Sequence, residues 1–247
     1  GYHGTHLVIS QLRRLSGNVN FESVPLPTPD GIASCLSAGD VIWLETPINP
    51  TCDLHDIAAY ATAAKATGGI HVVVDGTFAP PPIQRPLELG AKVVLHATTK
   101  YLAGHSDVMG GALCVNDSEL AKKLREDRTA LGSTPGNLET WLLIRSIRTL
   151  HLRVQQQSRT ASELASWLQA ATVNGSSVES SGVPHPLQGL VHAVHHPSLP
   201  CHPSHALAEQ QMPGGFGGCF ALELTTEEAA RALPGALTLF RNATSLG

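Results

Sequence analysis

The stretch His71-Val72-Val73-Val74-Asp75-Gly76-Thr77-Phe78 decides the fold, together with a second apolar run, Ala91-Lys92-Val93-Val94-Leu95-His96. Both runs are rich in β-branched and aliphatic residues and predict buried strands. Asp75 ends the first run, and Lys100 follows the second within Ala97-Thr98-Thr99-Lys100-Tyr101. Open α/β sheets place their ligand chemistry at the carboxyl ends of the strands, so we expect Asp75 and Lys100 at that edge.

An aspartate and a lysine on neighbouring strand ends suit pyridoxal phosphate (PLP). The lysine amine forms a Schiff base with the cofactor's aldehyde, and a carboxylate pairs with the pyridinium nitrogen. A buried aspartate after three valines also needs a partner, which a protonated ring nitrogen supplies. The structural alternatives are a strand-end cap for Asp75 and a solvated surface charge for Lys100.

Further motifs stand in a fixed order along nearly the whole chain. They are Glu45-Thr46-Pro47-Ile48-Asn49-Pro50-Thr51, Asp75-Gly76-Thr77-Phe78-Ala79, Thr99-Lys100-Tyr101 with Gly104-His105-Ser106-Asp107, Arg145-Ser146-Ile147-Arg148-Thr149-Leu150, His202-Pro203-Ser204-His205, Gln211-Met212-Pro213-Gly214-Gly215-Phe216-Gly217-Gly218 and Ser245-Leu246-Gly247. The ordered set resembles the PLP-dependent enzymes of cysteine and methionine metabolism, the trans-sulfuration family. This resemblance implies fold type I, the α/β fold of aspartate aminotransferase: a mostly parallel, doubly wound sheet followed by the start of a smaller C-terminal α/β domain.

The resemblance also implies roles for individual residues. Lys100 is the Schiff-base lysine and Asp75 the partner of the ring nitrogen, while Asn49 hydrogen-bonds the phenolic oxygen of the cofactor. Tyr2 stacks on the pyridine ring and takes part in proton transfer, so Lys100 and Tyr2 are the expected catalytic pair. Thr77, in the motif of Asp75, is counted among the cofactor-binding residues.

The phosphate and substrate contacts match the family less completely. Thr99 matches a hydroxyl that contacts the phosphate, but the usual serine three residues before the lysine is Ala97 here. One phosphate hydrogen bond is therefore lost, or Thr98 makes it from a shifted position. Ser245 matches a position that lines the pocket for the substrate carboxylate.

Composition excludes several classes of function. Sixteen basic and twenty acidic side chains give no basic surface for nucleic acid and no polybasic patch for a membrane. No apolar run is long enough to cross a bilayer. The five cysteines are scattered, with no C-x-x-C pair and no secretory signal before them, so we expect a reducing, cytoplasmic setting.

Periodicity and capping residues predict strands that alternate with helices, which is typical of a mostly parallel sheet. We expect strands at 40–45, 71–75, 92–96, 111–115 and 219–224. We expect helices at 1–20, 53–67, 118–128, 138–171 and 226–233, the fourth being one long helical region.

The organisation predicts two units, a PLP-binding large domain at residues 1–157 and a linking helix with a small C-terminal domain at 158–247. Serine, glycine and proline become frequent at 174–186, which favours entry into the second unit there. The chain has no initiator methionine, and the family's Tyr-x-Arg phosphate clamp, Gly-Met phosphate loop and carboxylate-binding arginine have no match. We interpret the sequence as a fragment, incomplete in both domains.

Two further patterns have structural explanations. The histidines at 192, 195, 196, 202 and 205, with Cys201 among them, fit no standard zinc spacing, so we expect no metal site. The glycines at 214, 215, 217 and 218 resemble a phosphate loop, but no helix clearly follows them, which favours a tight entry into the next strand.

The resemblance implies a carbon–sulfur lyase or γ-substitution transferase that acts on the γ (or β) carbon of a sulfur amino acid. We favour the cystathionine γ-lyase type. Cystathionine γ-synthase or O-acetylhomoserine sulfhydrylase activity uses the same residues and stays open, and so does a truncated, non-catalytic remnant. Family members are homo-oligomers built as dimers of dimers, so we expect the same here.

Overall fold

The computed structural model describes residues 1–17, 22–172, 185–240 and 242–243. Its larger sheet has four strands in the order β1-β2-β3-β4. The strands are β1 (Val41–Glu45), β2 (His71–Asp75), β3 (Val93–Ala97) and β4 (Gly111–Cys114). The pairs β1–β2 and β2–β3 are parallel and β3–β4 is antiparallel, so the prediction of a mostly parallel sheet is confirmed.

Helix α3 (Ile57–Thr67) connects β1 to β2 and covers the apolar face of the sheet. Ile57, Tyr60 and Ala64 pack there against buried valine, isoleucine and leucine side chains of β1, β2 and β3. The prediction of a helix from residue 53 is wrong by four residues, because Asp56 is the cap: its side chain accepts from the Ala59 N–H. Residues 46–56 are therefore a loop at the carboxyl edge of the sheet.

Helix α1 (His3–Leu15) is shorter than the predicted 1–20. Ser16 caps it by donating its N–H to the Leu12 carbonyl, and Gly17 follows with φ of 68°, a left-handed conformation that glycine adopts easily. The helix buries none of its residues. Between α1 and β1 lie the short helices η1 (Pro29–Gly31) and α2 (Ile32–Cys35).

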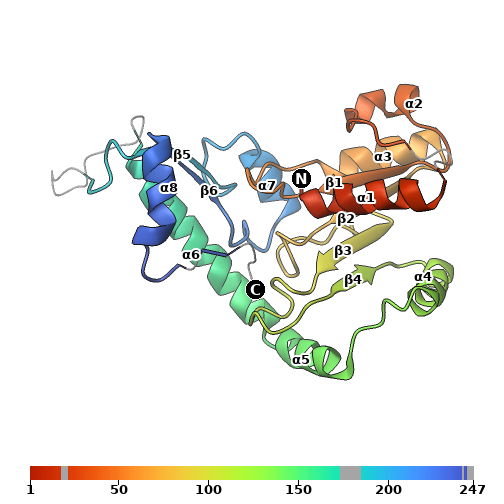
Figure 1. The fold of residues 1–247 in the computed structure, drawn as a ribbon. Helices are drawn as coiled ribbons and strands as arrows, with labels where there is room; N and C mark the ends of the chain where they lie inside the picture. Colours follow the sequence, from red (N-terminus) through yellow and green to blue (C-terminus); the bar gives the residue numbers. More distant parts are fainter. Residues whose placement is uncertain (18–21, 173–184, 241, 244–247) are drawn as a thin grey trace.

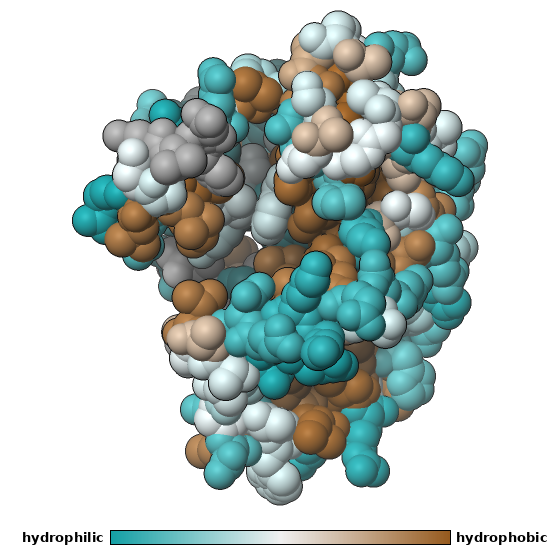
Figure 2. Space-filling model, turned by 90° about the vertical axis from the view of Figure 1, so that its right-hand side faces the viewer, coloured by the Kyte–Doolittle hydropathy of each residue, from teal (hydrophilic) through white to brown (hydrophobic). Residues whose placement is uncertain are grey.

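Helix α4 (Ser118–Ala130) follows β4 and is capped by Asp117, which accepts from the N–H groups of Glu119 and Leu120. Lys92 also contacts Asp117 with 2.6 Å between Nζ and Oδ2. The helix buries none of its residues, and Figure 2 shows it as a block of hydrophilic side chains in the middle of one face.

The helical region predicted over 138–171 is helical except for one short break. The structure has two helices there, α5 (Asn137–Ile147) and α6 (Leu150–Ala170). The chain turns at Arg148 and Thr149, where the Thr149 N–H donates to the Ser146 carbonyl. The Arg153 guanidinium donates to the same carbonyl at 3.1 Å, so the end of α5 is satisfied without continuing the helix.

Helix α6 runs from the larger sheet to a second, two-stranded sheet (Figure 1). Its Val154 packs beside Tyr101, and its Ala165 and Leu168 pack beside the second sheet. That sheet pairs β5 (Val191–His195) with β6 (Ala221–Leu224) in antiparallel fashion, and α7 (His205–Gln211) and α8 (Glu227–Ala236) complete this part of the fold. The sequence patterns missed β5 and α7, and the domain boundary at 157–158 stays a prediction.

Candidate functional site

The carboxyl ends of β1, β2 and β3 bring together the residues that the sequence singled out. Glu45 and Asp75 end neighbouring strands and are partners in the register of the β1–β2 pair. Lys100 follows the end of β3 by three residues, and its N–H donates to the Ala97 carbonyl at 3.1 Å. The sheet therefore places Asp75 and the Lys100 turn on adjacent strand ends, as predicted.

Asp75 is buried, with 8% of its surface exposed. Its Oδ1 accepts two hydrogen bonds from Thr77, one from the backbone N–H at 3.0 Å and one from the hydroxyl at 2.6 Å. Burial raises the pKa of Asp75 above its usual value, although the two Thr77 bonds oppose that rise and the charge of Glu45 adds to it. Burial thus disfavours the charged carboxylate, which a cation placed beside it would stabilise.

Thr77 links β2 to the Lys100 segment. Its Oγ1 donates to Asp75 and accepts the Ala97 N–H at 3.0 Å. One hydroxyl therefore fixes the Asp75 carboxylate and the first residue of the Ala97-to-Lys100 turn relative to one another.

These groups fit PLP by their chemistry. A carboxylate whose charged form is disfavoured by burial suits a protonated ring nitrogen, and a lysine amine on the next strand end suits the aldehyde. Asp75 and Lys100 are therefore the residues that would hold the two ends of the ring system.

Tyr2 and Asn49 meet at a third residue, Glu45. The Tyr2 N–H donates to Glu45 Oε2 at 2.5 Å, and the Asn49 N–H donates to Glu45 Oε1 at 2.8 Å. Tyr2 is 52% exposed and Asn49 is half-buried. The structure thus brings these two predicted site residues to the end of β1, beside Asp75.

Hydrogen bonds from the segment around α7 hold the loop that carries Asn49. Ser204 Oγ accepts the Leu54 N–H at 2.9 Å, and Gln211 Oε1 accepts the Ile57 N–H at 3.0 Å. The His202 ring contacts the Thr51 carbonyl at 3.3 Å. The second part of the chain therefore fixes the position of a loop of the first part.

The histidine-rich stretch serves packing in the described structure. Besides His202, the His205 ring contacts the Pro197 carbonyl at 2.7 Å and the His196 ring contacts the Gly217 carbonyl at 3.4 Å. Burial lowers the pKa of His196 to about 4. Among the residues that the structure describes, no group of three or more histidine, cysteine, aspartate or glutamate side chains is arranged to hold a metal ion.

The turn after Lys100 is fixed by α6 and by the glycine-rich loop. Arg153 donates to the carbonyls of Tyr101 and Leu102 at 2.9 and 3.4 Å. The Tyr101 hydroxyl lies 3.1 Å from Cys219 Sγ and accepts the Gly218 N–H at 3.1 Å. The glycine-rich loop therefore packs against the lysine segment before it enters the second sheet.

The residues predicted to contact the phosphate and the substrate carboxylate differ in their surroundings. Thr99 Oγ1 accepts the Gly110 N–H at 3.1 Å, so its hydroxyl stabilises the approach to β4. Thr98 is 2% exposed. Whether Thr98 makes the phosphate bond that Ala97 lacks stays a prediction. Ser245 lies outside the described residues.

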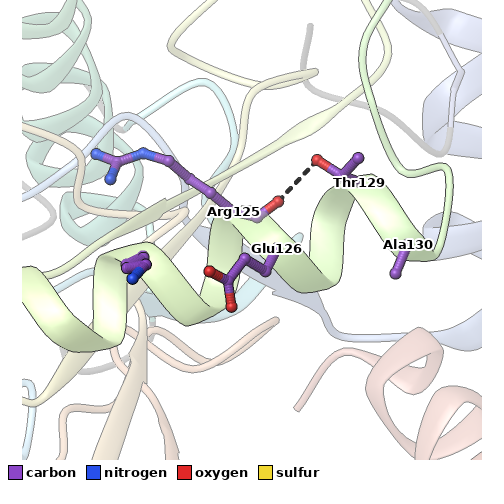
Figure 3. Close-up of a pocket in the computed structure, with 5 residues that line it drawn as sticks. Arg125, Glu126, Thr129 and Ala130 are labelled. Atoms are coloured by element: carbon purple, nitrogen blue, oxygen red, sulfur yellow. Dashed lines mark hydrogen bonds between the residues drawn. The ribbon is translucent and has the colours of Figure 1, made fainter.

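A shallow hollow on α4 has no relation to this cluster. Figure 3 shows it lined by Arg125, Glu126, Thr129 and Ala130, with Lys122 as the fifth residue. The Thr129 hydroxyl donates to the Arg125 carbonyl of the same helix at 2.9 Å. All five residues belong to one surface helix, and none is a predicted site residue.

Sequence reasoning missed the roles of Glu45 and Arg153. Glu45 ends a buried strand as Asp75 does, so the same pattern contained the signal. Arg153 follows the motif Arg145-to-Leu150, but its contacts with the Lys100 turn, 51 and 52 residues away, need the tertiary structure.

Comparisons with known proteins identify the family. The family profile described as Cys/Met metabolism PLP-dependent enzyme matches residues 1–247. The chain belongs to this family. It is 38% identical over 234 residues to a probable cystathionine gamma-synthase of Herpetosiphon aurantiacus. The matched region covers 94% of this chain and 67% of that protein.

Two other similar proteins are named for different activities. A cystathionine beta-lyase of Coxiella burnetii is 34% identical over 250 residues, covering 100% of this chain and 59% of that protein. The solved structure of CalE6, a methionine gamma lyase from Micromonospora echinospora, superimposes with a TM-score of 0.79 and 39% identity, covering 94% of this chain and 59% of that one. This chain thus has the α/β fold of PLP-dependent trans-sulfuration enzymes and spans about 60% of the length of most of these relatives.

Proposed function

We propose that this chain forms the PLP-binding core of a trans-sulfuration enzyme that acts at the γ (or β) carbon of a sulfur amino acid. The observation that carries the proposal is the cluster of Asp75, Thr77 and the Lys100 turn at one sheet edge. Membership of the family and the activity names of the relatives support the same class of reaction.

Each residue has a separate task in this proposal. Bound PLP would supply an electron sink for the negative charge that develops at the substrate Cα. Asp75, oriented by Thr77, would hold the ring nitrogen. Lys100 Nζ would form the covalent link to the cofactor and then take the Cα proton of the substrate, while the Tyr2 hydroxyl would share proton transfer with it.

Asn49 and Thr99 would complete the contacts to the cofactor. The Asn49 amide would donate to the phenolic oxygen, and the Thr99 hydroxyl would contact the phosphate. Ser245 would line the pocket for the substrate carboxylate. Ala97 has no hydroxyl, and each absent charge-assisted bond would cost on the order of 1.5–3 kcal/mol of phosphate binding.

Within this class we favour the cystathionine γ-lyase reaction. The relatives include a γ-synthase, a β-lyase and a methionine γ-lyase, so they support the class and leave γ-substitution as the alternative. Incubation with cystathionine alone should release cysteine, ammonia and a four-carbon keto acid, whereas cleavage at the β carbon would release homocysteine, ammonia and a three-carbon keto acid. Formation of cystathionine from an O-acylated homoserine and cysteine, without ammonia release, would instead assign the chain to the γ-substitution enzymes.

We also propose that the protein works as a homo-oligomer in a reducing, cytoplasmic setting. All five cysteines are free thiols, which supports the second part. In the part of the chain that the structure describes, no helix has both the length and the apolar character needed to span a bilayer. Size-exclusion chromatography with light scattering, at several protein concentrations, would test the oligomer.

A visible spectrum tests the cofactor assignment. Added PLP should give the yellow band of a lysine-bound cofactor with the wild-type chain and with the Lys122→Ala control on the surface of α4. Lys100→Ala should give only the spectrum of the free aldehyde. An unchanged yellow band in Lys100→Ala, or no band in the wild type, would contradict the proposal, and the second result would favour a non-catalytic remnant.

A further inference from the structure

Glu45 connects two segments of the candidate site that are far apart in the sequence. Its Oε2 accepts the N–H of Tyr2, 43 residues away, and its Oε1 accepts the N–H of Asn49, four residues away. Each carboxylate oxygen therefore has one backbone donor. Neither contact involves the side chain of Tyr2 or Asn49, so both side chains remain available to a ligand while their backbones are fixed.

The position of Glu45 is electrostatically unfavourable, which argues that its carboxylate has a function there. It is the register partner of Asp75 on the next strand, so two carboxylates end adjacent strands. Two carboxylates on adjacent strand ends repel one another. A glutamine would remove the repulsion, but its amide nitrogen is a donor and would face one of the two N–H groups. Among side chains of this length, only a carboxylate offers an acceptor to both.

We propose that Glu45 is a positioning residue that holds Tyr2 and Asn49 together beside Asp75, so that both reach the cofactor in a fixed geometry. This role rests on the proposed function, because it acts through residues that would touch PLP. Glu45 itself makes no contact with the cofactor in this proposal. Its effect on PLP binding should therefore depend on the Tyr2 and Asn49 side chains.

The first experiment uses the chain without cofactor. Amide proton and nitrogen shifts are compared for the wild type, Glu45→Gln and the control Glu88→Gln, whose side chain is exposed and pairs only with the exposed Arg85 among the described contacts. The Tyr2 and Asn49 amide signals should move in Glu45→Gln and stay in place in the control. Unmoved signals in Glu45→Gln would overturn the link.

The second experiment measures PLP affinity in a double-mutant cycle. Glu45→Gln should weaken binding about 10-fold in the wild-type background, as expected when one charge-assisted bond is lost. In a chain that already contains Tyr2→Ala and Asn49→Ala, the same substitution should change affinity by less than about 2-fold. The bound cofactor's absorption maximum should also shift in Glu45→Gln and not in Glu88→Gln.

The outcomes separate the two proposals. Equal losses in both backgrounds would show that Glu45 acts directly on the cofactor or on the fold, and would overturn this role alone. A wild-type chain that binds no PLP would overturn the proposed function and this role with it.

Discussion

Asp75 and Thr77 lie at the end of a central strand of the sheet, whereas Tyr2 and Asn49 lie on the chain before α1 and on the loop after β1. Asp75 is 8% exposed and receives both its described bonds from a residue two positions away. Tyr2 is 52% exposed and is held through its backbone by Glu45. We call the first pair the inner half of the site and the second the outer half.

The comparison shows that one site is positioned by two kinds of interaction. The inner half is fixed by strand pairing and by local hydrogen bonds, so it forms whenever the sheet forms. The outer half depends on contacts between distant segments, such as Tyr2 with Glu45 and Leu54 with Ser204. Substitutions in the inner half should therefore change turnover or the free energy of unfolding. Substitutions in the outer half should mainly change the geometry of the bound cofactor.

The largest expected effect is on the chemistry of the inner half. Asp75→Asn should lower turnover about 10²–10⁴-fold, because a neutral amide does not keep the ring nitrogen protonated. The cofactor-free protein should keep its melting temperature, since burial disfavours the charged form of Asp75 and an amide oxygen still accepts from Thr77. Near-normal turnover would remove Asp75 from the inner half.

The reactivity of the Cys52 thiol tests whether the turn that carries Asn49 stays closed in the folded chain. Cys52 follows the Asn49 turn and is 2% exposed, and burial raises its pKa to about 12. Its thiolate fraction should then be about 10³-fold below that of an ordinary cysteine, so a disulfide reagent should label it only after unfolding. The exposed Cys35 and Cys201 are the internal controls. Rapid labelling of Cys52 in the folded chain would show that the turn opens readily.

The free energy of unfolding tests the contribution of the Thr77 hydroxyl, which joins the ends of β2 and β3. Thr77→Val removes the donor to Asp75 and the acceptor of the Ala97 N–H. Denaturant unfolding of the cofactor-free chain should show a loss of about 1–3 kcal/mol. Thr77→Ser keeps the hydroxyl and should lose clearly less. A larger loss in Thr77→Ser than in Thr77→Val would mean that the methyl group, and not the hydrogen bonds, matters at this position.

The smallest expected effect is on the stability of the outer half. Tyr2→Phe should change the free energy of unfolding by less than about 0.5 kcal/mol, because the side chain is largely exposed and the bond to Glu45 comes from the backbone. Its effect should appear in turnover instead. A large loss of stability in the cofactor-free chain would make the division between the two halves untenable.

The inner half could be predicted from the sequence because its signals are local. Valine runs ending in Asp75 and leading to Lys100 predicted strands whose observed bounds differ by no more than one residue. The outer half could be predicted only by resemblance, since the meeting of Tyr2 with Glu45 depends on how α1 returns to the sheet. Strand β5 was missed because its histidines obscured the apolar pattern, and the break between α5 and α6 needed the Arg153 contacts.

Borohydride reduction of the PLP-loaded chain tests the central claim, that Lys100 and Asp75 form one cofactor site. Reduction traps the bond between cofactor and amine as a stable pyridoxyl group, which peptide mapping then locates. We expect the group on Lys100 in the wild type, with strongly reduced incorporation in Asp75→Asn at limiting PLP. A pyridoxyl group on any other lysine, or on several lysines without preference, would contradict the account.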